Sequence, residues 1–329
     1  MSDRPLLNIS DLHVSFQSET GLVDAVSGVS LELYPGETLG LVGESGCGKS
    51  VTAMSVLRLL PQPAGKIVGG QVLFEGSDLL KQPLDVMRGI RGRRIGMIFQ
   101  EPMAALNPVQ TIGAQLLEVF QLHMPEMSAT QSVKRGIELL ERVGIPEAEQ
   151  RLKEYPHQLS GGMRQRVMIA MALAGEPDVL IADEPTTALD VTIQAQILNL
   201  IADIQKETGM AMIFITHDLG VVAAICQRIA VMYAGQIVEL AARDDFFRNP
   251  RHPYSQGLLH SLPGMDGAPK QPLPAIEGQV PPSSQWGSGC RFVNRCFAAN
   301  ASCAENAQVL SEISTGIQVR CERWQEVSN

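Results

Sequence analysis

A glycine-rich segment suited to phosphate binding has the sequence Gly43-Glu44-Ser45-Gly46-Cys47-Gly48-Lys49-Ser50. It fits the pattern G-x-x-x-x-G-K-[ST], which wraps the phosphates of a nucleoside triphosphate. Glycine lets backbone N–H groups approach phosphate oxygens, because no Cβ stands in the way. Lys49 would place its charge beside the β- and γ-phosphates, and Ser50 would offer its hydroxyl to Mg²⁺.

Two carboxylates follow a second apolar segment, Val179–Ala182. Asp183 is placed to hold Mg²⁺ at the end of a buried strand. Glu184 would point elsewhere because strand residues alternate, and it would act as the general base for the attacking water. A solvated Asp-Glu turn is the alternative. Beside a phosphate loop, a nucleotide site is the better interpretation.

A third segment, Leu159–Gln165, contains Ser160, Gly161 and Gly162. The serine can cap a helix whose first N–H groups are bared by the glycines, so this is a second helix end able to bind phosphate. One nucleotide does not need two phosphate-binding helix N-termini from the same subunit. We therefore expect the helix of Ser160 to contact a nucleotide held by another subunit. A capped helix without a ligand is the alternative.

Short apolar strands that alternate with helices must position these segments, which predicts an α/β core with a largely parallel sheet. We expect strands at Leu7–Phe16, Val29–Leu33, Thr38–Val42, Gln71–Phe74, Ile95–Phe99, Val179–Ala182, Met212–Thr216, Ile229–Tyr233 and Gln236–Leu240. A helix at Ser50–Leu60 would follow the phosphate loop. Helical patterns at Ile112–Leu122, Ser132–Val143 and Pro146–Lys153 predict an inserted helical subdomain at about 101–164.

Composition restricts the function. The 329 residues carry a net charge of −9, which disfavours nucleic acid as the main partner. The apolar runs are shorter than the 18 or more residues of a membrane span, and the N-terminus lacks the apolar core of a signal peptide. We therefore expect a cytosolic protein without structural disulfides.

The order of these motifs resembles that of ATP-binding cassette (ABC) ATPases over residues 1 to about 260. Walker A is Gly43–Ser50, Walker B is Val179–Asp183 and the signature is Leu159–Gln165. Gln100 matches the Q-loop, Ala188-Leu189-Asp190 the D-loop and His217 the switch histidine. Phe16 resembles the aromatic residue that stacks on adenine.

The resemblance implies a P-loop (RecA-like) core, an antiparallel β subdomain and ATP hydrolysis. Two subunits would enclose two ATP molecules, each between one Walker A and the opposite signature. Glu184, His217 and Gln100 would be catalytic, and Mg²⁺ would contact Ser50, Gln100 and Asp183. ATP contacts are implied for Phe16, Gly43, Glu44, Ser45, Gly46, Cys47, Gly48, Lys49, Ser50, Val51, Ser160, Gly161, Gly162, Gln165 and Asp190.

Three further segments, Tyr155–Met163, Asp190–Gln196 and Arg251–Tyr254, resemble dipeptide and oligopeptide importer ATPases. This implies a subunit that powers peptide import from the cytoplasmic face of the membrane. Its partners would be two permease subunits, a second ABC ATPase (heterodimer favoured, homodimer possible) and, indirectly, an extracytoplasmic binding protein. Nickel chelates, antimicrobial peptides or glutathione remain alternative cargoes. Cassette ATPases acting on DNA or ribosomes, and monomeric P-loop kinases, fit less well.

The expected domains are a nucleotide-binding domain at 1–262 and a tail at 263–329. Prolines crowd the region Pro263–Pro282, which predicts an extended linker. Cys290, Cys296, Cys303 and Cys321 follow it, and four thiols in a poorly apolar segment suggest a metal centre. The close C-x₂₋₄-C pairs of zinc sites are absent, whereas irregularly spaced thiolates can hold an iron–sulfur cluster. The tail resembles that of the peptide-importer ATPases, to which a [4Fe–4S] cluster has been assigned. Zinc and the absence of any metal are the alternatives.

The two other cysteines raise separate expectations. Cys226 lies in an apolar helical pattern and is expected in the core. Cys47 occupies the phosphate loop, where a helix N-terminus would lower its thiol pKa. We therefore expect bulky thiol reagents to block ATP binding through Cys47.

Overall fold

The computed structural model describes residues 4–19, 21–101, 105–186, 190–262 and 275–327. The chain forms two compact units. The first unit contains Tyr34–Glu37 and Lys81–Phe214, and the second contains Pro5–Leu33, Thr38–Leu80 and Ile215–Asn329. Among the described residues, no helix is long and apolar enough to cross a membrane.

The second unit begins with an antiparallel sheet in the order β2-β1-β4-β5. Its strands are β1 (Leu7–Ser18), β2 (Gly21–Leu33), β4 (Gly65–Phe74) and β5 (Ser77–Asp78). Apolar residues alternate along β1 and β2, which buries one face of the sheet. This is the antiparallel β subdomain that the family resemblance implies.

The same unit contains strands in the order β11-β12-β10-β9-β3. They are β3 (Thr38–Val42), β9 (Arg228–Tyr233), β10 (Gln236–Ala242), β11 (Ser311–Ser314) and β12 (Ile317–Val319). β3 is parallel to β9, whereas β9, β10, β12 and β11 pair antiparallel. The helices are α1 (Lys49–Val56), α9 (Leu219–Ile225), α10 (Arg243–Arg248), α11 (Pro253–His260), α12 (Ala301–Glu305) and α13 (Trp324–Val327).

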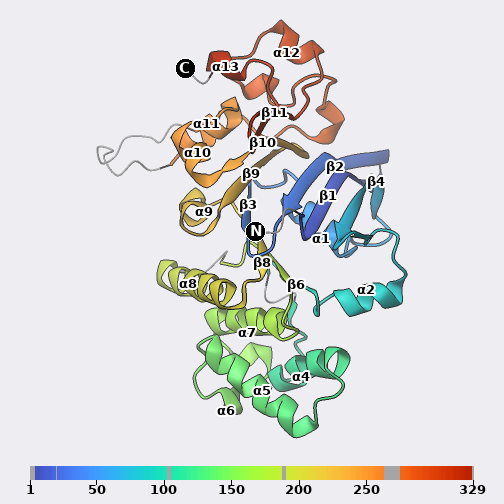
Figure 1. The fold of residues 1–329 in the computed structure, drawn as a ribbon, viewed down its shortest axis with the longest axis vertical. Helices are drawn as coiled ribbons and strands as arrows, with labels where there is room; N and C mark the ends of the chain where they lie inside the picture. Colours follow the sequence, from blue (N-terminus) through green and yellow to red (C-terminus); the bar gives the residue numbers. More distant parts are fainter. Residues whose placement is uncertain (1–3, 20, 102–104, 187–189, 263–274, 328–329) are drawn as a thin grey trace. The chain divides into compact units, whose positions relative to one another are not determined.

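The tail is more ordered around its cysteines than the prolines suggest. Its hairpin β11–β12 adds to β10, where Glu239 pairs with Val319. Ile317 and Val319 are buried, as is Phe292. The tail therefore extends a sheet instead of forming only an irregular arm (Figure 1).

In the first unit the strand order is β8-β7-β6, with β6 (Ile95–Ile98) parallel to β7 (Val179–Asp183). Most of β8 (Ala211–Thr216) belongs to this unit. The helices are α2 (Leu84–Ile90), α4 (Ile112–His123), α5 (Ala129–Arg142), α6 (Ala148–Arg151), α7 (Gly161–Leu173) and α8 (Val191–Thr208). Figure 1 shows α4, α5 and α6 gathered beside α7, as their packing requires.

Side-chain caps fix where several of these helices begin. Thr111 caps α4, and Ser128 forms a capping box with Gln131 at the start of α5. The structure confirms the predicted fold class, with mixed parallel and antiparallel sheets and an inserted group of helices. Several boundaries differ: α1 ends at Val56, short of the predicted Leu60, and β2 and β4 begin at Gly21 and Gly65, well before the predicted Val29 and Gln71.

Candidate nucleotide site

Glycine is required at both ends of the phosphate loop. The loop leaves the buried strand β3 at Gly43, which has φ 152°, and enters α1 at Gly48, which has φ 110°. A Cβ on Gly43 would lie 2.1 Å from the carbonyl oxygen of Met232, and one on Gly48 would lie 2.7 Å from that of Ala25. Both the positive φ and the lack of space for a Cβ exclude residues other than glycine at these two positions.

Lys49 begins α1 and is buried. Its Nζ donates hydrogen bonds to the carbonyl oxygens of Gly43 (2.7 Å) and Glu44 (3.0 Å). Ser45 and Gly46, at the tip of the loop, are exposed. The loop thus holds a positive charge and a helix N-terminus beneath an accessible tip, which is an arrangement that attracts phosphate.

Glu184 contacts Gln100 in the first unit. Strand β7 is buried through Asp183, which is 4% exposed, and Glu184 follows it with φ 45°. This left-handed backbone is costly for a residue other than glycine and is typical of functional sites. Nε2 of Gln100 donates to Oε2 of Glu184 at 3.2 Å. The sequence predicted roles for both residues but not this contact.

The signature segment forms a capped helix, as predicted. Oγ of Ser160 accepts a hydrogen bond from N of Met163 (3.3 Å), and Ser160 and Gly161 are exposed at the start of α7. Gln165 is buried and donates to the carbonyl oxygen of Pro185, directly after Glu184. The signature helix is therefore joined to the loop that carries the predicted base.

The remaining predicted residues occupy separate positions. His217 is exposed directly after β8, in the second unit. Phe16 is half-buried on β1, opposite Gly65 of β4. Asp190 caps α8 by accepting from N of Ile193 at 3.0 Å. The rest of the predicted D-loop, Ala188 and Leu189, lies outside the described residues.

Sequence reasoning missed two partners of the phosphate loop. Arg295 binds the carboxylate of Glu44, and Tyr254 accepts a hydrogen bond from the backbone N of Glu44 (2.9 Å). Tyr254 belongs to Arg251–Tyr254, a segment singled out only as a family mark. Arg295 lies 251 residues after Glu44, so no local pattern could reveal the pair.

The expectation of a lowered thiol pKa at Cys47 is wrong. Its side chain is 1% exposed, and burial raises the pKa of its thiol more than neighbouring Lys49 lowers it. Helix position alone suggested a thiolate, but desolvation disfavours the charged form. Cys226 is buried, as predicted, directly after α9, and burial raises its pKa to about 12.

The four tail cysteines line one small cavity of about 20 Å³. None is in a disulfide, and N of Cys290 donates to the carbonyl oxygen of Cys303 at 2.7 Å. Burial raises the thiol pKa of Cys290, Cys296 and Cys321. Among the described residues, however, no group of His, Cys, Asp or Glu side chains is arranged to hold a metal ion. The thiols converge without metal-site geometry, and the cavity has room for about one water molecule.

Known proteins place the chain in a family. Residues 26–187 match the family model described as ABC transporter. Over 324 residues the chain is 52% identical to the probable peptide ABC transporter ATP-binding protein y4tR of Sinorhizobium fredii, covering 98% of this chain and 96% of the relative. The chain belongs to the ATP-binding proteins of ABC transporters. It is thus an ATP-hydrolysing enzyme.

Other proteins similar to this chain support the same family assignment. The dipeptide transport ATP-binding protein DppD of Bacillus subtilis is 54% identical, covering 88% of this chain and 86% of the relative. The dimeric ABC cassette MJ0796 shares 28% identity with a TM-score of 0.65, covering 72% of this chain and 98% of that one. Residues 238–303 match the model described as oligopeptide/dipeptide transporter, C-terminal region.

Proposed function

We propose that this ABC ATPase powers the import of dipeptides and oligopeptides through a membrane permease. The match of residues 238–303 to the oligopeptide/dipeptide transporter C-terminal region carries this proposal, because that region lies outside the general cassette model. Relatives named for peptide transport that align over most of the chain support it. We place the nucleotide-binding domain at 1–262, its helical subdomain at about 101–164 and the importer-type tail at 263–329.

For catalysis we propose that Glu184 acts as the base, with His217 and Gln100 organising the water and the γ-phosphate. Mg²⁺ would be held by Ser50, Gln100 and Asp183, whose oxygens suit a hard cation. ATP would lie against Phe16 and the loop Gly43–Val51. Ser160, Gly161, Gly162, Gln165 and Asp190 would face the nucleotide of the opposite subunit.

We further propose that the chain sits peripherally on the cytoplasmic face of the inner membrane, without a nucleic-acid partner. It would dock on two permease subunits and pair with a second, different ABC ATPase. An extracytoplasmic binding protein would deliver the peptide. The dimeric solved cassette supports pairing of cassettes in general.

Purification from membranes, followed by mass spectrometry of the bound subunits, tests these partners. The reconstituted complex should take up a labelled peptide only when ATP is present. Uptake of a nickel chelate or glutathione, with no uptake of any peptide, would replace the proposed cargo. Recovery of a homodimer alone would replace the proposed heterodimer.

We also propose that the four tail cysteines ligate a [4Fe–4S] cluster, as the importer resemblance implies. The four thiols line one cavity, but no group of the described side chains is arranged to hold a metal ion, so the cavity would have to expand to hold four iron and four sulfide ions. Protein purified without oxygen should be brown, absorb near ~400 nm and contain about four iron and four sulfide per chain. Colourless, iron-free protein would reject the cluster, and stoichiometric zinc would replace it.

A further inference from the structure

Arg295 of the tail forms a two-point ion pair with Glu44 of the phosphate loop. Nη1 lies 2.6 Å from Oε2, and Nη2 lies 2.9 Å from Oε1. The Arg295 side chain is 5% exposed and that of Glu44 is 32% exposed. Such a fork-to-fork geometry is the strong form of this interaction, and burial of the guanidinium limits its screening by salt.

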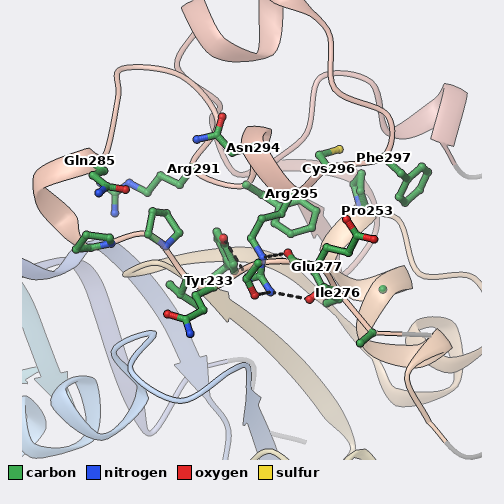
Figure 2. Close-up of a pocket in the computed structure, with 18 of the residues that line it drawn as sticks. Tyr233, Pro253, Ile276, Glu277, Gln285, Arg291, Asn294, Arg295, Cys296 and Phe297 are labelled. Carbon is green, nitrogen blue, oxygen red and sulfur yellow. Dashed lines mark hydrogen bonds between the residues drawn. The ribbon is translucent and has the colours of Figure 1, made fainter. Parts of the chain in front are cut away.

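The guanidinium of Arg295 is fixed by its other partners. Nε donates to the carbonyl oxygen of Glu277 (2.8 Å), and Nη2 donates to those of Ile276 and Gly278 (3.2 Å each). Figure 2 shows the guanidinium of Arg295 hydrogen-bonded to the segment of Ile276 and Glu277. These residues line a cavity of about 970 Å³. Hydrogen bonding to Glu44 raises the pKa of Arg295 above its usual range. The tail thus presents a permanent, oriented positive charge.

Tyr254 holds the backbone of Glu44 from a second direction. Its hydroxyl accepts from N of Glu44, and its ring packs against Tyr233 and Phe292 at centroid distances of 4.6 and 5.3 Å. Phe292 lies three residues before Arg295. The tail and α11 therefore fix both the main chain and the carboxylate of one loop residue.

Glu44 stands where a negative charge opposes the function of the loop. Its own carbonyl oxygen accepts a hydrogen bond from Nζ of Lys49. A carboxylate without a partner on this loop would repel the phosphates of a nucleotide. Pairing with Arg295 cancels that charge and holds the carboxylate in one orientation.

We propose that Arg295 is a positioning residue for nucleotide binding, which neutralises Glu44 and sets the conformation of the phosphate loop. The proposal rests on the ATP-binding role of this loop and not on the cargo or the permease. Failure of peptide import would leave it intact. A wild-type chain unable to bind ATP would instead remove the proposed function itself.

Titration of the purified full-length chain with ATP, ADP and AMP tests the proposal. Arg295→Gln should raise the dissociation constant for ATP by about fivefold, because one uncompensated charge faces the phosphates. The rise should shrink from ATP to ADP to AMP as the phosphate charge falls. Arg295→Lys keeps the charge but loses the two-point geometry, so its dissociation constant for ATP should lie between those of wild type and Arg295→Gln.

The double variant Arg295→Gln/Glu44→Gln separates charge from structure. Removing both charges should lower the dissociation constant for ATP below that of Arg295→Gln, to the value of Glu44→Gln alone. A purely structural role of Arg295 would leave the double variant as weak as Arg295→Gln, and that result would overturn the proposal. So would an unchanged ATP affinity in Arg295→Gln.

Arg291→Gln is the matched control. Arg291 also docks the tail, through the carbonyl oxygen of Ala234 (2.6 Å) and Oγ of Ser27 (2.9 Å), but it does not contact Glu44. This variant should loosen the tail to a similar degree, seen as a lower melting temperature, while ATP affinity stays unchanged. Equal loss of affinity in Arg291→Gln and Arg295→Gln would assign the effect to tail docking instead of charge.

Discussion

Nε2 of Gln100 lies 3.2 Å from Oε2 of Glu184, so the second residue after β6 contacts the residue that follows β7. These strands are parallel neighbours, and the ends of parallel strands meet at one edge of a sheet. The amide therefore holds the carboxylate that we propose as the general base.

The proposed base is tested by Glu184→Gln. The amide keeps the size of the side chain but cannot accept a proton, so turnover should fall at least about 100-fold while ATP affinity is kept. Steady-state phosphate release and nucleotide titration measure the two quantities. Glu138→Gln, which changes a surface carboxylate on α5, is the control and should hydrolyse ATP normally. Near-normal turnover in Glu184→Gln would remove Glu184 as the base.

A substitution of Ser160 tests the proposed pairing of subunits. Ser160→Arg puts a long cation at the exposed start of α7, where a nucleotide of the opposite subunit would lie. ATP binding to the single chain should be unchanged, whereas nucleotide-dependent dimerisation and hydrolysis should fall at least about tenfold. Light scattering with ATP and a hydrolysis assay provide the readouts. Val133→Arg, on exposed α5, controls for added charge; unaffected hydrolysis in Ser160→Arg would contradict pairing through the signature.

The sequence predicted the elements better than their distant contacts. Buried apolar runs identified β3 with its correct ends, and Gly, Lys and Ser identified the phosphate loop because each residue type has a local chemical reason. The tail hairpin was missed, since Ile317 and Val319 form too short a pattern to distinguish from a loop. The Arg295–Glu44 pair was missed for a different reason: tertiary folding alone brings these residues together.

Cysteine accessibility provides another test. Cys47 and Cys226 are buried with raised thiol pKa values, so both should resist alkylation in the native protein near neutral pH. Mass spectrometry after a brief exposure to iodoacetamide should find label on neither, and unfolding in guanidinium should label both. Rapid native labelling of Cys47 that MgATP prevents would restore the reactive thiol expected from the sequence.

A buried histidine makes stability depend on pH. His252 is 1% exposed, and burial, with Arg320 as a smaller cause, lowers its pKa to about 3. Its neutral Nδ1 accepts the hydrogen bond from N of Tyr254 that caps α11 (3.0 Å). Between pH 6.5 and 3 the unfolded chain binds the extra proton, so the free energy of unfolding falls as pH falls through this window.

From pH 6.5 to 5 this histidine should remove about 2 kcal/mol of stability. His252→Asn keeps a capping side chain but does not titrate. Its stability at pH 7 should be lower because a buried ring is lost, yet its stability should depend less on pH by that same amount. Urea denaturation of both proteins at several pH values measures the difference, in which the other titrating groups cancel. Parallel pH curves for the two proteins would mean that His252 is not held neutral by the fold.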